Sequence, residues 1–91
     1  MDKEVIQFLS RHNSLISYLP EVFKQIDKYF PNAPLEICVF DNYETNPHLR
    51  IEIIMNANMS PEMALAIFNE FRYDWWLDHI EELISIGVNW R

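Results

Sequence analysis

The sequence predicts a single α+β domain over residues 1–91, with elements in the order helix, helix, strand, strand, helix, strand. Three observations predict this class. Residues 1–30 carry apolar side chains at spacings of three and four, the period of an amphipathic helix. Two runs of alternating apolar and polar residues follow, separated by turn-forming residues. A helix-start signature at Ser60-Pro61 then opens an aromatic-rich segment, and the chain closes on another alternating run.

The N-terminal third predicts two helices. Asp2 can cap a first helix whose apolar residues continue to Leu19. Pro20 is expected to end or kink that helix, and it can equally be the first residue of the next one. A second apolar stripe runs from Val22 to Phe30, and the two prolines within residues 31–34 then stop helix formation.

The middle of the chain predicts an antiparallel hairpin with one buried face. Residues 35–41 and 48–55 alternate, and residues 42–47 between them are rich in turn formers. The side chains expected on the buried face are Leu35, Ile37, Val39, Leu49, Ile51, Ile53 and Met55. Cys38, Phe40, Arg50, Glu52 and Ile54 are expected on the outer face.

The C-terminal third predicts a long aromatic-rich helix and a third strand. Ser60 is the expected N-cap, and the apolar stripe shifts after Trp76, so a kink or a fresh short helix is expected near Trp76-Leu77. Residues 84–90 alternate as a strand. A right-handed crossover would place this strand parallel to the second and beside the first. The helices are expected to cover one sheet face, with Trp75 and Trp90 in the core.

Composition excludes several classes of function. Fourteen acidic residues against seven basic ones give a net charge of −7, so no basic face is expected to bind nucleic acid directly. Cys38 is the only cysteine, which excludes a disulfide framework and a cysteine metal site. No apolar run approaches the roughly 18 residues of a membrane span, and the N-terminus does not resemble a signal peptide. A cytoplasmic protein without a cofactor is expected.

Acidic residues near the aromatic helix offer the main catalytic alternative. Glu70, Asp74, Asp78 and Glu81 recur at helical spacing, where they could bind a divalent cation or act as acid and base. A solvated helix face is the favoured interpretation, because side chains on one straight helix rarely converge on one ion. The enzyme alternative is a small metal-dependent or hydrolytic enzyme using Asp74, Asp78, His79 and Glu82. The single glycine excludes a glycine-rich phosphate loop.

The favoured function is a small acidic, non-enzymatic protein-interaction module. Aromatic residues make up 14% of the chain, more than one small core readily hides. A protein partner or self-association into a homo-oligomer is therefore expected. A narrower alternative is an antitoxin-like subunit that neutralises a basic toxin or nuclease through its charge. The residues expected at the interaction surface are Cys38, Phe40, Ile54, Tyr73 and Trp76.

The chain also resembles a group of small uncharacterised bacterial proteins. The resemblance lies in Phe30-Pro31, Ser60-Pro61-Glu62, Ala64-Leu65 and Trp75-Trp76-Leu77-Asp78, and it covers roughly residues 19–91. The chain departs from the pattern at Met63, which replaces an acidic residue. The resemblance implies the same order of helices and strands, and it implies no activity and no catalytic residues.

Overall fold

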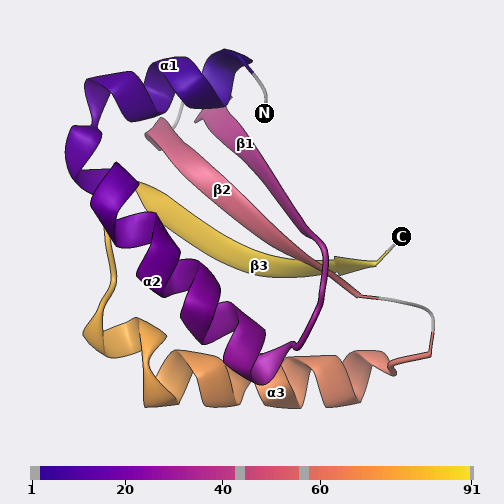
Figure 1. The fold of residues 1–91 in the computed structure, drawn as a ribbon. Coiled ribbons are helices and arrows are strands. Elements are labelled where there is room, and N and C mark those ends of the chain that lie inside the picture. Colours follow the sequence, from indigo (N-terminus) through magenta and orange to yellow (C-terminus); the bar gives the residue numbers. More distant parts are fainter. Residues whose placement is uncertain (1–2, 43–44, 56–57, 91) are drawn as a thin grey trace.

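The computed structural model describes residues 3–42, 45–55 and 58–90, and it has the α-α-β-β-α-β order that the sequence predicts (Figure 1). Two helices lead into a hairpin, and a third helix leads into the last strand. The elements are α1 (Lys3–Arg11), α2 (Asn13–Tyr29), β1 (Leu35–Asn42), β2 (Thr45–Met55), α3 (Pro61–Asp74), the 3-10 turn η1 (Trp76–Asp78) and β3 (Ile84–Trp90).

The three strands form a mixed sheet in the order β1-β2-β3. β1 and β2 are antiparallel, and Ile37 lies opposite Ile51. β2 and β3 are parallel, and Leu49 lies opposite Ile84. The parallel direction was correctly predicted, but the predicted position of β3 beside β1 is wrong. The crossover through α3 returns β3 to the free side of β2, since strands that follow each other in the chain are usually neighbours.

The core lies between one face of the sheet and the helices. Every second residue of β2 from Leu49 to Met55 is buried there, as the alternation predicts. The opposite face of the sheet carries Arg50, Glu52 and Asn89, which are only half-buried. The buried core consists of Val5, Phe8, Leu15, Leu19, Val22, Ile26, Phe30, Leu49, Ile51, Ile53, Met55, Ala64, Phe71, Trp76 and Ile84. Among the described residues, no helix is both long and apolar enough to cross a membrane.

The break between the first two helices falls at His12, so the expected end of a helix at Pro20 is wrong. His12 has φ −130° and ψ 65°, outside the helical region, whereas Pro20 lies inside α2. The chain changes direction between α1 and α2 (Figure 1). Phe8 on α1 and Leu15 on α2 are both buried in the core. Pro20 leaves the carbonyl of Ile16 without its usual helical donor, because proline has no N–H.

The start and end of α3 follow the sequence signals. The Ser60 hydroxyl accepts a hydrogen bond from the Met63 N–H at 3.2 Å, as an N-cap does. The helix ends at Asp74, and η1 follows at once, which confirms the predicted change of helix near Trp76. Because Trp75 has φ −140° at this junction, the next indole turns back toward the core.

Trp90 is 36% exposed at the end of β3, so its predicted place in the core is wrong. Its strand partner Met55 is the last residue of β2, and the sheet ends there. Trp75 is half-buried and packs against the core from its margin. The aromatic residues are therefore divided between the core, its margin and the surface.

Candidate protein-interaction surface

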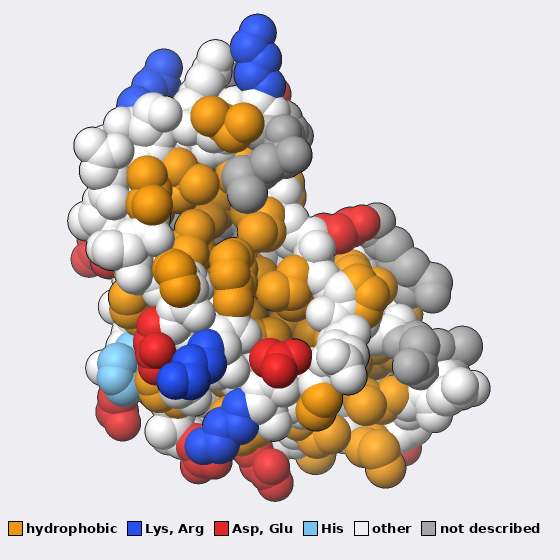
Figure 2. Space-filling model, in the orientation of Figure 1, with side chains coloured by type: hydrophobic (Ala, Val, Ile, Leu, Met, Phe, Trp, Pro, Cys, Tyr) orange, Lys and Arg blue, Asp and Glu red, His pale blue; other side chains and the backbone are white. Residues whose placement is uncertain are grey.

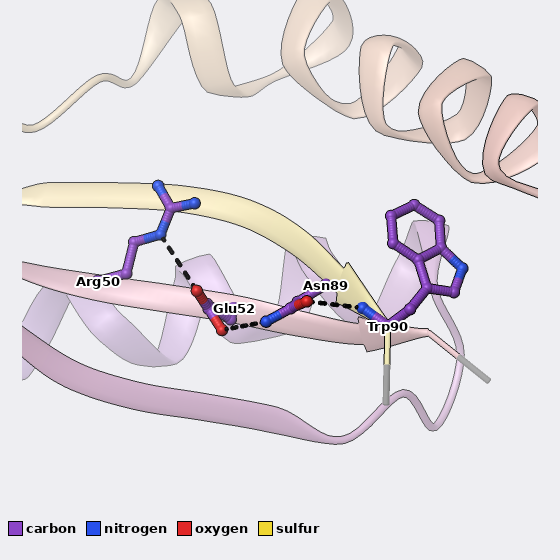
Figure 3. Close-up of polar contacts among 4 residues, drawn as sticks. All are labelled: Arg50, Glu52, Asn89 and Trp90. Atoms are coloured by element: carbon purple, nitrogen blue, oxygen red, sulfur yellow. Dashed lines mark hydrogen bonds and ion pairs between the residues drawn. The ribbon is translucent and has the colours of Figure 1, made fainter.

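The outer face of the sheet carries a short polar network at its centre (Figure 3). Arg50 and Glu52 form an ion pair at 3.9 Å, and the Asn89 side chain donates to the other Glu52 oxygen at 3.0 Å. The Asn89 side-chain oxygen in turn accepts from the Trp90 N–H at 2.9 Å. The bond from Asn89 to Glu52 joins β3 to β2, and the Glu52 carboxylate is engaged by both Arg50 and Asn89.

Gly87 makes room for the Arg50 side chain on this face. A Cβ atom at Gly87 would lie 2.3 Å from a guanidinium nitrogen of Arg50. The guanidinium therefore extends across the glycine of the neighbouring strand. The backbone of Gly87 has no positive φ, so the space rather than the conformation favours glycine here.

Three of the predicted surface residues lie on the outer face, near the edge formed by β1. Cys38 is exposed, Phe40 is 46% exposed, and Ile54 is half-buried. The Phe40 ring contacts His48 on β2, with ring centroids 5.4 Å apart. Cys38 lies opposite Arg50 in the strand register, as expected. The outer face thus carries Cys38 and Phe40 next to the charged Glu36 on β1, and Arg50, Glu52 and Ile54 on β2.

The two remaining predicted surface residues, Tyr73 and Trp76, differ in their exposure to solvent. Tyr73 is 72% exposed near the end of α3, as predicted. Trp76 is only 8% exposed, so its prediction as a surface residue is wrong. Its ring stacks on Phe71 with centroids 6.5 Å apart, and on Trp75 at 6.1 Å. The sequence prediction continued the helical period past residue 74, whereas the end of α3 turns this indole inward.

The acidic residues of the catalytic alternative do not share one helix. Glu70 and Asp74 lie on α3, Asp78 lies in η1, and Glu81 lies in the segment before β3. Among the described residues, no three His, Cys, Asp or Glu side chains come together as a metal site. Glu81 accepts a hydrogen bond from the Leu83 N–H at 3.3 Å. This is a role in the backbone turn.

Asp74 and His79 are engaged in contacts that join α2 to the end of α3. The Tyr29 hydroxyl donates to Asp74 at 2.9 Å, and the Tyr18 hydroxyl donates to the His79 carbonyl. The His79 ring stacks on Trp75 at 4.5 Å, and its Nδ1 lies 2.8 Å from the Trp75 carbonyl. Glu82, the remaining residue of this alternative, is exposed.

Both tyrosines are held in the neutral form by their surroundings. The hydrogen bond to Asp74 raises the pKa of Tyr29 above its usual value, with burial and the charges of Asp74 and Glu70 adding to the effect. Burial raises the pKa of Tyr18, and the charges of Glu81 and Glu21 raise it further. A phenol in the neutral form is a hydrogen-bond donor, which is the role both hydroxyls have here.

An apolar cavity of about 280 Å³ lies where α2 ends and the sheet begins. Its described lining includes the phenol of Tyr29 but no Asp, Glu, His, Lys or Arg side chain. Its lining residues are Tyr29, Phe30, Pro31, Asn32, Ala33, Pro34, Ile54, Met55 and Met59.

A second apolar area lies on the helix-covered side of the sheet, at β1. The inner side chains of β2 from Leu49 to Ile53 are fully buried, whereas those of β1 are only half-buried. Figure 2 shows hydrophobic side chains gathered across the region bounded by α1, α2 and β1. We call this area the edge apolar surface, and define it by Leu35, Ile37, Val39, Ile16 and Phe23.

Sequence reasoning missed the edge apolar surface. Alternation placed the β1 side chains on the core face, which is correct, but it gives no information about which strand is at the edge of the sheet. Ile16 is 53% exposed on α2, and this position does not belong to the buried stripe that includes Leu15 and Leu19. In the sequence, the available signal was an isoleucine at position 16, outside the spacing of three and four that joins Leu15 to Leu19 and Val22.

No family model, curated protein or solved structure matches this chain.

Proposed function

We propose that this chain is a small, non-enzymatic protein-interaction module of the bacterial cytoplasm. The observation that carries the proposal is the edge apolar surface, which combines Ile16, 53% exposed on α2, with the half-buried inner side chains of β1. Contiguous apolar surface of this kind is characteristic of interaction sites in small soluble domains.

The distribution of polar groups supports the same function. Asp74 and His79, the residues of the enzyme alternative that a catalyst would need free, have structural partners in Tyr29 and the Trp75 carbonyl. The apolar cavity at the end of α2 is lined by no Asp, Glu, His, Lys or Arg side chain. By contrast, β1 is at the edge of the sheet, and no described strand pairs with its outer side.

Affinity capture tests the proposal. The tagged chain, together with the variants Phe23→Asp and Tyr73→Asp, would be recovered from a lysate of its own host at low salt. Both variants replace an aromatic side chain by aspartate, but only Phe23 belongs to the edge apolar surface. We expect the unchanged chain and Tyr73→Asp to retain the same stoichiometric chain, and Phe23→Asp to lose it. Equal recovery from all three, or recovery of the bait alone with no self-association, would remove the proposal.

The salt dependence of capture distinguishes the two forms of this function. A neutralising, antitoxin-like subunit with a net charge of −7 would release a basic partner between about 50 mM and 1 M salt, because exposed charges are screened at the upper end. An interaction through the edge apolar surface would survive the same change, since apolar burial is not weakened by salt.

A further inference from the structure

We infer that the partner of the edge apolar surface is a second copy of this chain, joined by antiparallel pairing of β1 with β1 about a two-fold axis at Cys38. The inference rests on the proposed interaction function and specifies its partner. The pairing would extend the three-stranded sheet of each copy into one continuous sheet.

The outer edge of β1 has backbone groups available for such pairing. The Ile54 N–H donates to the Pro34 carbonyl at 2.9 Å, so residues 34 and 54 form a hydrogen-bonded pair. By the alternation of antiparallel ladders, Glu36 and Cys38 then also bond toward β2. Ile37 and Val39 therefore direct their N–H and C=O groups away from β2, where no described strand pairs with them.

Apart from the charged Glu36, the central part of β1 has few of the features that protect an edge strand. Between Leu35 and Phe40 it contains no proline and no lysine, and its ladder with β2 is regular. The irregularity in the register comes later, between Phe40 and Asn42. In Figure 1 α1 lies at the C-terminal end of β1, which it contacts, and no helix runs along the rest of its open side. A regular edge segment with unpaired outward-pointing backbone groups is the geometry that pairs with another strand.

The position of the two-fold axis follows from register and charge. The outward-pointing N–H and C=O groups of the two β1 strands must lie opposite each other to form hydrogen bonds. Because the residues that carry these groups are two positions apart, the two-fold axis passes through a residue and not between two residues. An axis at Val39 or later would extend the pairing into the irregular part of the strand. An axis at Glu36 would place two carboxylates directly opposite, and an axis at Ile37 would make them diagonal neighbours. These positions are therefore unfavourable.

An axis at Cys38 avoids these conflicts. Ile37 lies opposite Val39 of the second copy on the inner face, and the two Glu36 residues are four positions apart. At a rise of about 3.4 Å per residue they are about 13–14 Å apart, beyond the roughly 8 Å Debye length of physiological salt. The shared charge of the two copies therefore does not oppose pairing at this edge.

The same axis also covers the edge apolar surface. A two-fold axis between antiparallel strands is perpendicular to the sheet, so the helices of both copies lie on one side of it. On α2, Ile16 and Phe23 lie two turns apart on the flank opposite Tyr18 and Tyr29, which contact the end of α3. This flank of α2 therefore points toward the β1 side of the sheet, where α1 also contacts β1.

Sedimentation equilibrium tests the pairing in solution, with Cys38→Ser included to exclude a disulfide artefact. We expect a dimer for the unchanged chain, for Cys38→Ser and for Tyr73→Asp. We expect Phe23→Asp to weaken dimerisation by about tenfold or more, the usual effect of removing a central interface aromatic. The dimer is expected to persist at high salt. A monomer at about 100 μM, or equal dimerisation of Phe23→Asp, would overturn the inference.

Disulfide trapping with copper–phenanthroline and dissolved oxygen tests the register. Opposed residues in a non-hydrogen-bonded pair have Cα atoms about 4.5 Å apart, so two Cys38 thiols are within disulfide range. We expect rapid cross-linking of the unchanged chain, and none of Glu36→Cys or Phe40→Cys in a Cys38→Ser background. Cross-linking through position 36 or 40 in place of 38 would overturn the register.

The results separate this inference from the proposed function. If the unchanged chain is a monomer but captures another protein, and Phe23→Asp does not capture it, then self-pairing is contradicted and the interaction function remains. A monomeric chain that captures nothing would contradict both. Melting temperatures of all variants, followed by circular dichroism, identify any variant that fails to fold, and for such a variant the milder Phe23→Ser would take its place.

Discussion

Replacing Trp76 by alanine tests the central correction to the sequence-based prediction. The side chain is 8% exposed and stacks on Phe71 and Trp75. A buried aromatic removes roughly 150–250 Å² from water, which at about 25 cal/mol per Å² is about 4–6 kcal/mol. Measured losses for comparable substitutions are about 3–5 kcal/mol. We therefore expect Trp76→Ala to reduce the free energy of unfolding by about 3–5 kcal/mol.

Urea unfolding followed by far-ultraviolet circular dichroism measures this loss at one fixed protein concentration. Domains of this length are stable by roughly 5–14 kcal/mol, so the variant would be near its limit of stability. Trp76→Leu therefore accompanies it and should show a smaller loss. Tyr73→Ala is the control, because Tyr73 is 72% exposed and its removal should change stability by no more than about 0.5 kcal/mol. Equal, small losses for Trp76→Ala and Tyr73→Ala would refute the placement of Trp76 in the core.

Three further predictions concern the helices and the sheet. Pro20→Ala should stabilise the protein by about 1–3 kcal/mol in urea unfolding, because it returns a donor to the Ile16 carbonyl; a loss of stability would contradict this. Because the pKa of Tyr29 is raised in the folded state, its hydrogen bond contributes fully to the free energy of unfolding below about pH 10, and this contribution is lost as pH rises further. Between about pH 8 and pH 11, the stability of Tyr29→Phe should therefore fall less than that of the unchanged chain. Among the described residues, the buried Ser85 hydroxyl has no hydrogen-bond partner, so Ser85→Ala should not lower the melting temperature, and a clear decrease would contradict this.

The sequence was sufficient for the elements whose signals are local. Ser60-Pro61 starts α3, and the prolines after Phe30 end the second helical segment, because capping and backbone restriction act within a few residues. Alternation correctly assigned the inner face of β2. These features depend on neighbouring residues alone, and they were predicted correctly.

The errors arose where tertiary packing decides. Pro20 was predicted to break the helix, but the break at His12 lets both helical segments contact the core, and α2 accommodates the proline. The helical period placed Trp76 outside, and the end of α3 turned it inward. Trp90 follows the alternation of β3 but lies where the sheet ends. In each case the element type was right and its position was set by contacts distant in sequence.

The candidate surface was only partly predictable for the same reason. Cys38, Phe40 and Tyr73 lie at the surface as expected, because each falls outside an apolar stripe. The edge apolar surface depends on β1 being an edge strand, which follows from the placement of β3 beside β2. The predicted position of β3 beside β1 would have covered this edge. Because β3 pairs with β2, β1 is at the edge of the sheet and is available for pairing.

The oligomeric state of the Cys38→Ser chain is the most direct test of the account. Sedimentation equilibrium of this variant at physiological salt reports on pairing through β1 with no disulfide possible. A reversible dimer, weakened by adding Phe23→Asp and unaffected by adding Tyr73→Asp, is the predicted result. A monomer at about 100 μM would contradict it and leave the edge apolar surface to a different partner.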